Sequence, residues 1–204
     1  MTKKVKVEVW SDFVCPFCLI AEHPLRQAVQ AAQATGVQVD IEWMPFELRP
    51  HPTPTLRPED TYLQTVWPQS VYPVARHFGV ELKLPSVSPQ PHSALAWQGY
   101  QHAKAHNLGA AYNDAVLRAF FQQDLDIGRI EVLAGLAAGI GLDAQAFTAA
   151  LQDGRYREAH AQALARAQAE GVNSVPAFRI GTRRLAGVQD AQVLLQALQA
   201  AAQG

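Results

Sequence analysis

Apolar and polar side chains alternate with a period of two in two short stretches near the start of the chain. The apolar positions of the first stretch, residues 4–10, are Val5, Val7 and Val9, and lysine or glutamate stands between them. The second stretch, residues 37–44, alternates in the same way through Val37, Val39, Ile41 and Trp43. Such alternation is typical of a strand that buries one face. We therefore expect two strands here, joined by a helix that starts at Pro16 and stops at Gly36.

Helical spacing of apolar residues replaces this alternation from Thr61 to about Glu170. A proline-rich connector that begins at Pro45 precedes it. The predicted helices cover residues 62–78, 92–106, 112–123, 130–140, 143–152 and 155–170. Pro68 and Pro73 interrupt the first of them, and their missing N–H groups weaken its helical pattern.

Strand patterning returns after Gly171. Two strands, Ala177–Ile180 and Arg184–Gly187, flank a turn-forming segment and predict a hairpin, and Asp190 is placed to cap a last helix. The chain therefore predicts an α/β fold with the plan βαβ, helices, ββα. In this reading residues 1–60 and 171–204 are two parts of one domain, and residues 61–170 are a helical domain inserted between them.

Composition narrows the function classes. The chain has 204 residues, 49% of them hydrophobic, which is enough for one sizeable core or two small ones. The net charge of -1 argues against a general attraction to nucleic acid. The N-terminus leads into alternating residues rather than a continuous apolar run, so we expect no signal peptide, no membrane span and a cytoplasmic location.

The two cysteines of the chain, Cys15 and Cys18, carry the clearest chemical signal. Pro16 suits the first helical position, which places Cys15 at or next to the helix N-cap. Unpaired backbone N–H groups and the helix dipole favour an anion there, and cysteines in such settings have pKa values as low as roughly 3.5. Cys18 follows about one turn later, where it can attack a mixed disulfide on Cys15. The pattern predicts a dithiol–disulfide redox centre.

The two cysteines have three other interpretations. A structural disulfide would close a very small loop and stabilise the fold little. A zinc site would need two more ligands, which His102 and His106 could supply from one helix face. Two inert buried cysteines would be unusual beside a proline at a helix start. Asp12 and Glu22 lie near the motif, and we expect them to be solvated surface residues rather than proton relays.

The βαβ plus ββα plan with Cys-x-x-Cys at the first helix resembles the thioredoxin-like fold, and the helical insertion resembles the DsbA-like group. Within that group, Val9–Cys18 is similar to the opening of the FrnE-like dithiol–disulfide oxidoreductases and isomerases. Residues 45–50, 171–178 and 186–189 resemble further motifs of the same subgroup. The resemblance implies a cis Val175–Pro176 bond beside Cys15, with Cys15 as nucleophile and Cys18 as resolving cysteine. It also implies protein or peptide disulfides and dithiols as substrates, bound at Pro16, Phe17, Val175 and Pro176.

Two departures from related proteins shape this expectation. Phe17 stands where FrnE-like proteins commonly have Trp and the secreted DsbA proteins have His, so a strongly oxidising potential does not carry over. The kappa-class glutathione transferases and hydroxychromene-carboxylate isomerases have Ser at the position of Cys15, which leaves a glutathione-dependent transferase or isomerase as an alternative. A non-catalytic zinc- or peptide-binding module is the other. We expect no cofactor and no metal beyond the cysteine pair itself, and glutathione is one candidate for the electron donor.

Overall fold

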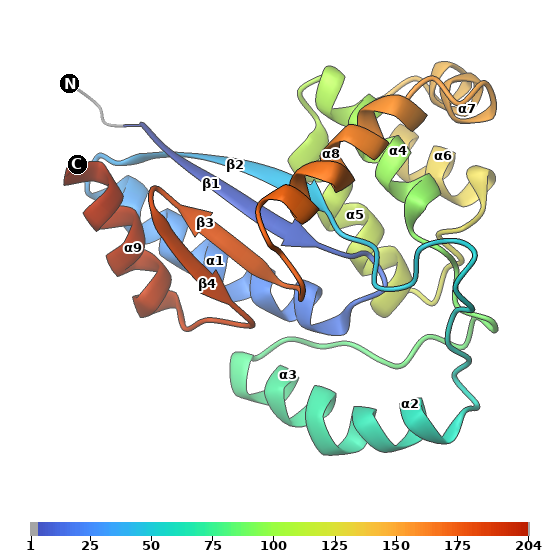
Figure 1. Cartoon of the computed structure of the whole chain (residues 1–204), viewed down its shortest axis with the longest axis horizontal. Coiled ribbons are helices and arrows are strands. Elements are labelled where there is room, and N and C mark those ends of the chain that lie inside the picture. The colour runs from blue at the N-terminus through green and yellow to red at the C-terminus, as the bar shows by residue number, and fades with distance from the viewer. Residues whose placement is uncertain (1–3, 204) are drawn as a thin grey trace.

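The alternating valines of the N-terminal stretch form the first strand of a four-stranded sheet (Figure 1). The computed structural model describes residues 4–203. Its strands are β1 (Lys4–Ser11), β2 (Gln38–Pro45), β3 (Ala177–Ile180) and β4 (Arg183–Ala186). Their order is β2-β1-β3-β4, with β1 parallel to β2 and antiparallel to β3. The central strand β1 therefore joins the N-terminal and C-terminal parts of the chain, as the DsbA-like thioredoxin plan requires.

Helices surround this sheet. They are α1 (Pro16–Ala34), α2 (Thr61–Val66), a π-helical segment η1 (Trp67–Val71), α3 (Tyr72–Phe78), α4 (Ala94–Ala105), α5 (Gly109–Phe121), α6 (Ile130–Gly139), α7 (Ala144–Gln152), α8 (Arg157–Ala169) and α9 (Ala191–Gln203). Helices α1 and α9 pack against each other and against the sheet, while α8 packs against β2 (Figure 1). Within residues 4–203 no helix has both the length and the apolar character needed to cross a membrane.

All the regular elements that the structure describes between Thr61 and Ala169 are helices, as the spacing of apolar residues predicted. This part does not have a separate core. One cluster of buried side chains contains Val7 and Val9 of β1 together with Phe120 and Leu133 of the helical part. The helices therefore pack directly on the sheet-bearing part. Treating residues 61–170 as a domain of its own stays a prediction.

The helix expected over residues 62–78 is present, and it is divided into three consecutive segments. Helix α2, the π-helical segment and α3 follow one another without a gap. Pro68 and Pro73 each fall at the start of one of these segments, in its first two positions. A proline is tolerated there because its missing N–H would have no partner within that helix.

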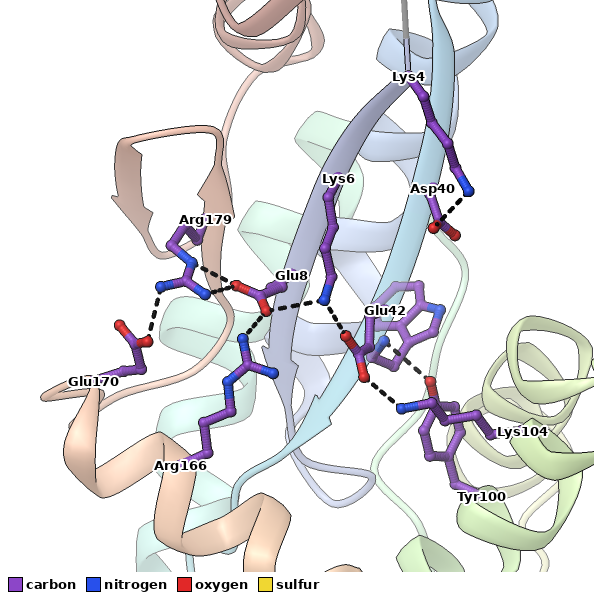
Figure 2. A network of polar contacts seen from close by, with 11 residues as sticks. Lys4, Lys6, Glu8, Asp40, Glu42, Tyr100, Lys104, Arg166, Glu170 and Arg179 are labelled. Carbon is purple, nitrogen blue, oxygen red and sulfur yellow. Dashed lines mark hydrogen bonds and ion pairs between the residues drawn. The ribbon is translucent and has the colours of Figure 1, made fainter.

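A network of charges covers the face of the sheet opposite α1 (Figure 2). Glu8 of β1 has 3% of its side chain exposed, and it pairs with Arg166 of α8, with Arg179 of β3 and with Lys6 at 3.4 Å. Arg179 also pairs with Glu170 at 2.8 Å. Because α8 and β3 share one buried carboxylate on β1, the network ties the last helix of the insertion to the sheet.

A second part of the network lies on β2. Glu42 pairs with Lys6 at 2.6 Å and with Lys104 of α4 (Figure 2). Burial alone would raise the pKa of Glu42, but the hydrogen bonds from the two lysines outweigh it and lower the pKa to about 2. Beside it, the Trp43 N–H donates to the Tyr100 hydroxyl at 3.1 Å, which satisfies a donor on the edge of the sheet. These contacts fix α4 against β2.

Candidate active site

The dithiol lies at the junction of β1 and α1. The chain turns after Ser11, and the Cys15 N–H donates to the Asp12 carbonyl at 3.0 Å. Cys15 is the N-cap residue of α1 with Pro16 directly after it, and the Cys18 N–H donates to the Cys15 carbonyl at 3.0 Å. Both cysteines are free thiols. The predicted placement of Cys15 at the start of the helix is therefore confirmed.

Both thiols are buried, although Cys15 lies at the N-terminus of its helix. The exposed fraction is 4% for Cys15 and 2% for Cys18. Pro16 and Phe17, between them, are half-buried. The cover over Cys15 comes from a loop 160 residues later, because its thiol donates to the Val175 carbonyl at 3.7 Å.

The Val175 loop lies beside the dithiol, as the resemblance implied. The Val175–Pro176 peptide bond is cis. Val175 is half-buried and Pro176 is buried. The Val175 carbonyl is turned towards the Cys15 thiol and accepts its hydrogen bond. Cys15 and Val175 are thus brought together, and Cys18 lies next to Cys15.

The groups around Cys18 shift the pKa of its thiol in opposite directions. Burial raises the pKa of Cys18 well above its usual value, and the neighbouring Cys15 raises it further. The Ser11 hydroxyl and the Asp12 N–H, which lies 3.5 Å from the Cys18 sulfur, lower it. Burial prevails, so the reduced Cys18 holds its proton at neutral pH.

Asp12 is buried, so its expected place on the solvated surface was wrong. Its exposed fraction is 0%, and burial raises the pKa of its carboxyl to about 6, against hydrogen bonds from Ser93 and from the Leu48 N–H at 2.7 Å. Glu47, which pairs with His160 of α8 at 2.6 Å, also raises it. The segment after β2 folds over the turn and shields Asp12 from water. The sequence around Asp12 does not predict this burial, because the covering segment is distant along the chain.

Glu22 was also expected on the surface and is buried in the structure. It lies on α1 one turn beyond Cys18, with 6% exposed. Burial raises the pKa of Glu22 to about 8, and the neighbouring Asp114 adds to the effect. Its Oε1 accepts a hydrogen bond from the Asn113 side chain of α5. The helical insertion covers this face of α1, which converts a helix-surface position into a core one.

A pocket of about 240 Å³ opens next to the dithiol turn. Its walls include Val14, Leu48, Arg49, Leu56, Tyr62 and Ser93. Leu48 and Tyr62 are 44% and 60% exposed, and they are two of the three large apolar side chains most exposed within residues 4–203. Arg49 has no ion-pair partner in the part of the chain that the structure describes. The pocket therefore offers an apolar surface and one uncommitted cation directly beside Val14.

The two histidines and the two cysteines proposed as zinc ligands do not form one site among the described residues. His102 and His106 stack on each other at 4.5 Å between ring centroids, and His102 packs against Phe147 and Tyr156 in the helical part. Across residues 4–203 no group of three or more His, Cys, Asp or Glu side chains is placed to hold a metal ion. The structure thus offers the zinc interpretation of Cys15 and Cys18 no ligand set.

Sequence reasoning missed Ser11, the pocket residues and the Glu8 network. Ser11 falls inside the Val9–Cys18 motif, although its odd-numbered place after Val7 and Val9 puts it on the buried face of β1. Leu48 and Arg49 lie in residues 45–50, a segment for which the sequence offers a family resemblance and no chemical role. Tyr62 carried no signal, because its exposure depends on how α2 is placed.

Comparison with known proteins places this geometry in a family. The model of the DSBA-like thioredoxin domain matches residues 6–199. The chain belongs to this family. It is also 41% identical over 196 residues to the uncharacterized protein YwbO of Bacillus subtilis (strain 168), a match that covers 95% of this chain and 96% of the relative.

Solved structures agree with this assignment. The probable DsbA oxidoreductase SCO1869 from Streptomyces coelicolor is 26% identical, with a TM-score of 0.76 over 97% of this chain and 89% of that chain. The cytosolic disulfide reductase DsbM from Pseudomonas aeruginosa with GSH is 20% identical, with a TM-score of 0.67 over 97% and 96%. A 2-hydroxychromene-2-carboxylate isomerase is 19% identical, with a TM-score of 0.71 over 96% and 93%. The last two share the fold with this chain.

Proposed function

We propose that this chain is a thiol–disulfide oxidoreductase or isomerase of the FrnE-like subgroup that acts through Cys15 and Cys18. The observation that carries the proposal is the position of the two thiols. Cys15 is the N-cap of α1 and touches the Val175 loop, while Cys18 lies beneath it one turn further along the helix. A helix N-terminus favours the thiolate as an anion, which suits Cys15 to the role of nucleophile.

In the proposed reaction the Cys15 thiolate attacks one sulfur of a substrate disulfide. That disulfide breaks, a mixed disulfide forms on Cys15, and the other substrate sulfur leaves and takes up a proton. Cys18 then loses its proton and attacks the Cys15 sulfur. The Cys15–Cys18 disulfide forms, and the second substrate sulfur leaves as a thiol. The reverse sequence oxidises a dithiol.

The substrate class that we propose is an extended protein or peptide. Phe17 and Val175 are half-buried beside Cys15 and are available for contact, whereas the buried Pro176 would shape the loop. The exposed Leu48 and Tyr62 at the neighbouring pocket would hold apolar side chains of the client, because exposed apolar patches of this kind mark interaction sites. We place this activity in the cytoplasm, with no metal and no cofactor.

The test is a trapping experiment with a denatured, disulfide-bonded protein and a small aromatic disulfide. Cys18→Ser should accumulate a mixed disulfide through Cys15, and Cys15→Ser should form none and lose exchange activity. Wild-type protein should turn over both substrates. Exchange that survives in Cys15→Ser, or a Cys18→Ser variant that traps nothing, would contradict the proposal.

A second candidate is a glutathione-dependent transferase or isomerase. Arg49 favours it, since this uncommitted guanidinium in the pocket beside Val14 could hold a carboxylate such as those of glutathione. The DsbM structure with GSH adds support for glutathione, as electron donor or as co-substrate. The two candidates separate in Cys18→Ser, because a glutathione-dependent reaction would survive that change and dithiol–disulfide exchange would stop after the first step.

A further inference from the structure

Ser11 has a buried hydroxyl that makes no hydrogen bond. It is the last residue of β1, and its side chain lies on the same face as those of Val7 and Val9 because residues two apart share a face of a strand. Its exposed fraction is 0%, and its oxygen has no partner within residues 4–203. The Ser11 hydroxyl is close enough to Cys18 to lower the pKa of its thiol. A buried polar group left without a partner costs free energy and calls for an explanation.

The next residue already offers a donor to the same sulfur. The Asp12 backbone N–H points at the Cys18 sulfur from 3.5 Å. Ser11 and Asp12 therefore place two donors, one hydroxyl and one amide, beside a thiol that is itself 2% exposed. The neutral Cys18 thiol accepts only a weak hydrogen bond from the amide, while a Cys18 thiolate would accept hydrogen bonds from both the amide and the hydroxyl.

We propose that the Ser11 hydroxyl and the Asp12 N–H form a donor pair that stabilises the negative charge on the Cys18 sulfur during exchange. The inference rests on the proposed function and names a residue that acts in its second step. The effects on charge agree with it: burial and the neighbouring Cys15 raise the pKa of Cys18, and the Ser11 hydroxyl is first among the groups that lower it.

The chemistry explains why such a pair is needed. In the resolving step the Cys18 thiol must lose its proton before its sulfur attacks Cys15 in the mixed disulfide. The Cys15–substrate bond breaks as the Cys15–Cys18 bond forms, and the released substrate thiolate takes up a proton. Burial opposes the charge on Cys18, so a donor that becomes engaged only when this charge forms lowers the barrier of this step alone. Cys15 reacts in the first step without this help.

The first test titrates Cys18 in a chain that lacks the other thiol. In a Cys15→Ala background, the rate of alkylation against pH reports the pKa of Cys18. Adding Ser11→Ala should raise that pKa by about one to two units, the value of a hydrogen bond to a charged group. The matched pair Ser11→Thr and Ser11→Val serves as control, since the two side chains have the same shape and only threonine keeps the hydroxyl. Threonine should keep the parent pKa and valine should raise it.

The second test separates the two chemical steps in the chain with both cysteines. Ser11→Ala should form the mixed disulfide at the wild-type rate and resolve it about three- to tenfold more slowly, because the lost thiolate fraction is partly offset by greater nucleophilicity. A Cys18 pKa that moves by less than about 0.3 unit in both Ser11→Ala and Ser11→Val would overturn the inference. If instead the pKa shifts as expected but no disulfide is exchanged, the proposed function fails while the donor pair stands.

Discussion

Asn113 on α5 donates a hydrogen bond from its side-chain amide to Oε1 of Glu22 on α1, across 91 residues of sequence. Both side chains are buried, and the remaining oxygen of each has no hydrogen-bond partner within residues 4–203, although the Arg26 guanidinium lies 3.9 Å from Oε2 of Glu22. A proton on Oε2 of Glu22 would supply the donor that both oxygens lack. This agrees with the raised pKa of Glu22, about 8, for which burial is the main cause. Glu22 is therefore protonated at neutral pH and joins the helical insertion to α1 as a neutral pair.

Replacing Glu22 by glutamine should make the protein relatively more stable as the pH rises. The carboxyl has a higher pKa in the folded than in the unfolded chain, so the wild-type protein loses stability between about pH 4.5 and pH 8 as the folded state is forced to ionise. The neutral amide of Glu22→Gln removes this loss. Urea unfolding at the two ends of this range should show the difference between variant and wild type growing by on the order of 3 kcal/mol. Glu131→Gln, at an exposed position on α6, is the control, and a difference for Glu22→Gln that does not change with pH would contradict the assignment.

The pocket beside the dithiol should select clients by their apolar side chains. Leu48→Ser and Tyr62→Ser remove exposed apolar surface there without touching a cysteine. We expect kcat/KM for a denatured, disulfide-bonded protein to fall about three- to tenfold in each, the cost of roughly 1 kcal/mol of lost apolar contact. Reduction of a small aromatic disulfide should be unchanged.

Leu125→Ser is the matched control for this prediction. Leu125 is the third exposed large apolar residue of the described chain, and it does not line the pocket. Its replacement should leave both substrates unaffected. If Leu125→Ser slows the protein substrate as much as Tyr62→Ser does, the loss reflects general surface polarity and the pocket is not the client site.

Arg179→Ala should destabilise the fold more than any exposed arginine does. Arg179 neutralises the buried Glu8, pairs with Glu170 at 2.8 Å and lies over the Trp10 ring at 5.9 Å from its centroid. Removing it leaves Glu8 with fewer partners in a site where the carboxylate is 3% exposed, and breaking a buried pair costs roughly 3–5 kcal/mol. Urea denaturation should show a loss at the lower end of this range, since Arg166 and Lys6 remain. Arg183→Ala, on the exposed edge strand β4, should change stability by less than about 0.5 kcal/mol, and equal losses in the two variants would refute the role of the network.

The sequence predicted what local chemistry decides and missed what distant segments decide. The period of two in Val5, Val7 and Val9 located β1, and Pro16 located the start of α1, because each signal acts within a few residues. The burial of Asp12 depends on the segment after β2 and on Ser93, and the burial of Glu22 depends on α5. Neither partner can be read from residues near the motif. The contact between Cys15 and Val175 spans 160 residues and was accessible only through resemblance to a family.

The same distinction applies to Gly99, a position that looks ordinary in sequence and is tightly constrained in the structure. Gly99 lies inside α4, where alanine would normally favour the helix by up to about 1 kcal/mol. A Cβ at this position would lie 2.7 Å from the Phe147 ring and 2.8 Å from the Tyr112 ring. Both rings are fully buried, so neither can move aside without disturbing the packing between α4, α5 and α7.

Gly99→Ala should therefore destabilise the protein by about 1–3 kcal/mol in spite of its better helix propensity. Gly135→Ala on α6 provides the opposite case, because an added Cβ there meets nothing within 4 Å and the position is exposed. That variant should be neutral or more stable by up to about 1 kcal/mol. Thermal unfolding of the two variants beside wild type measures both effects in one experiment. A stabilised Gly99→Ala would mean that Phe147 and Tyr112 yield easily, and that α4 is packed against α5 and α7 less closely than the contacts at Gly99 imply.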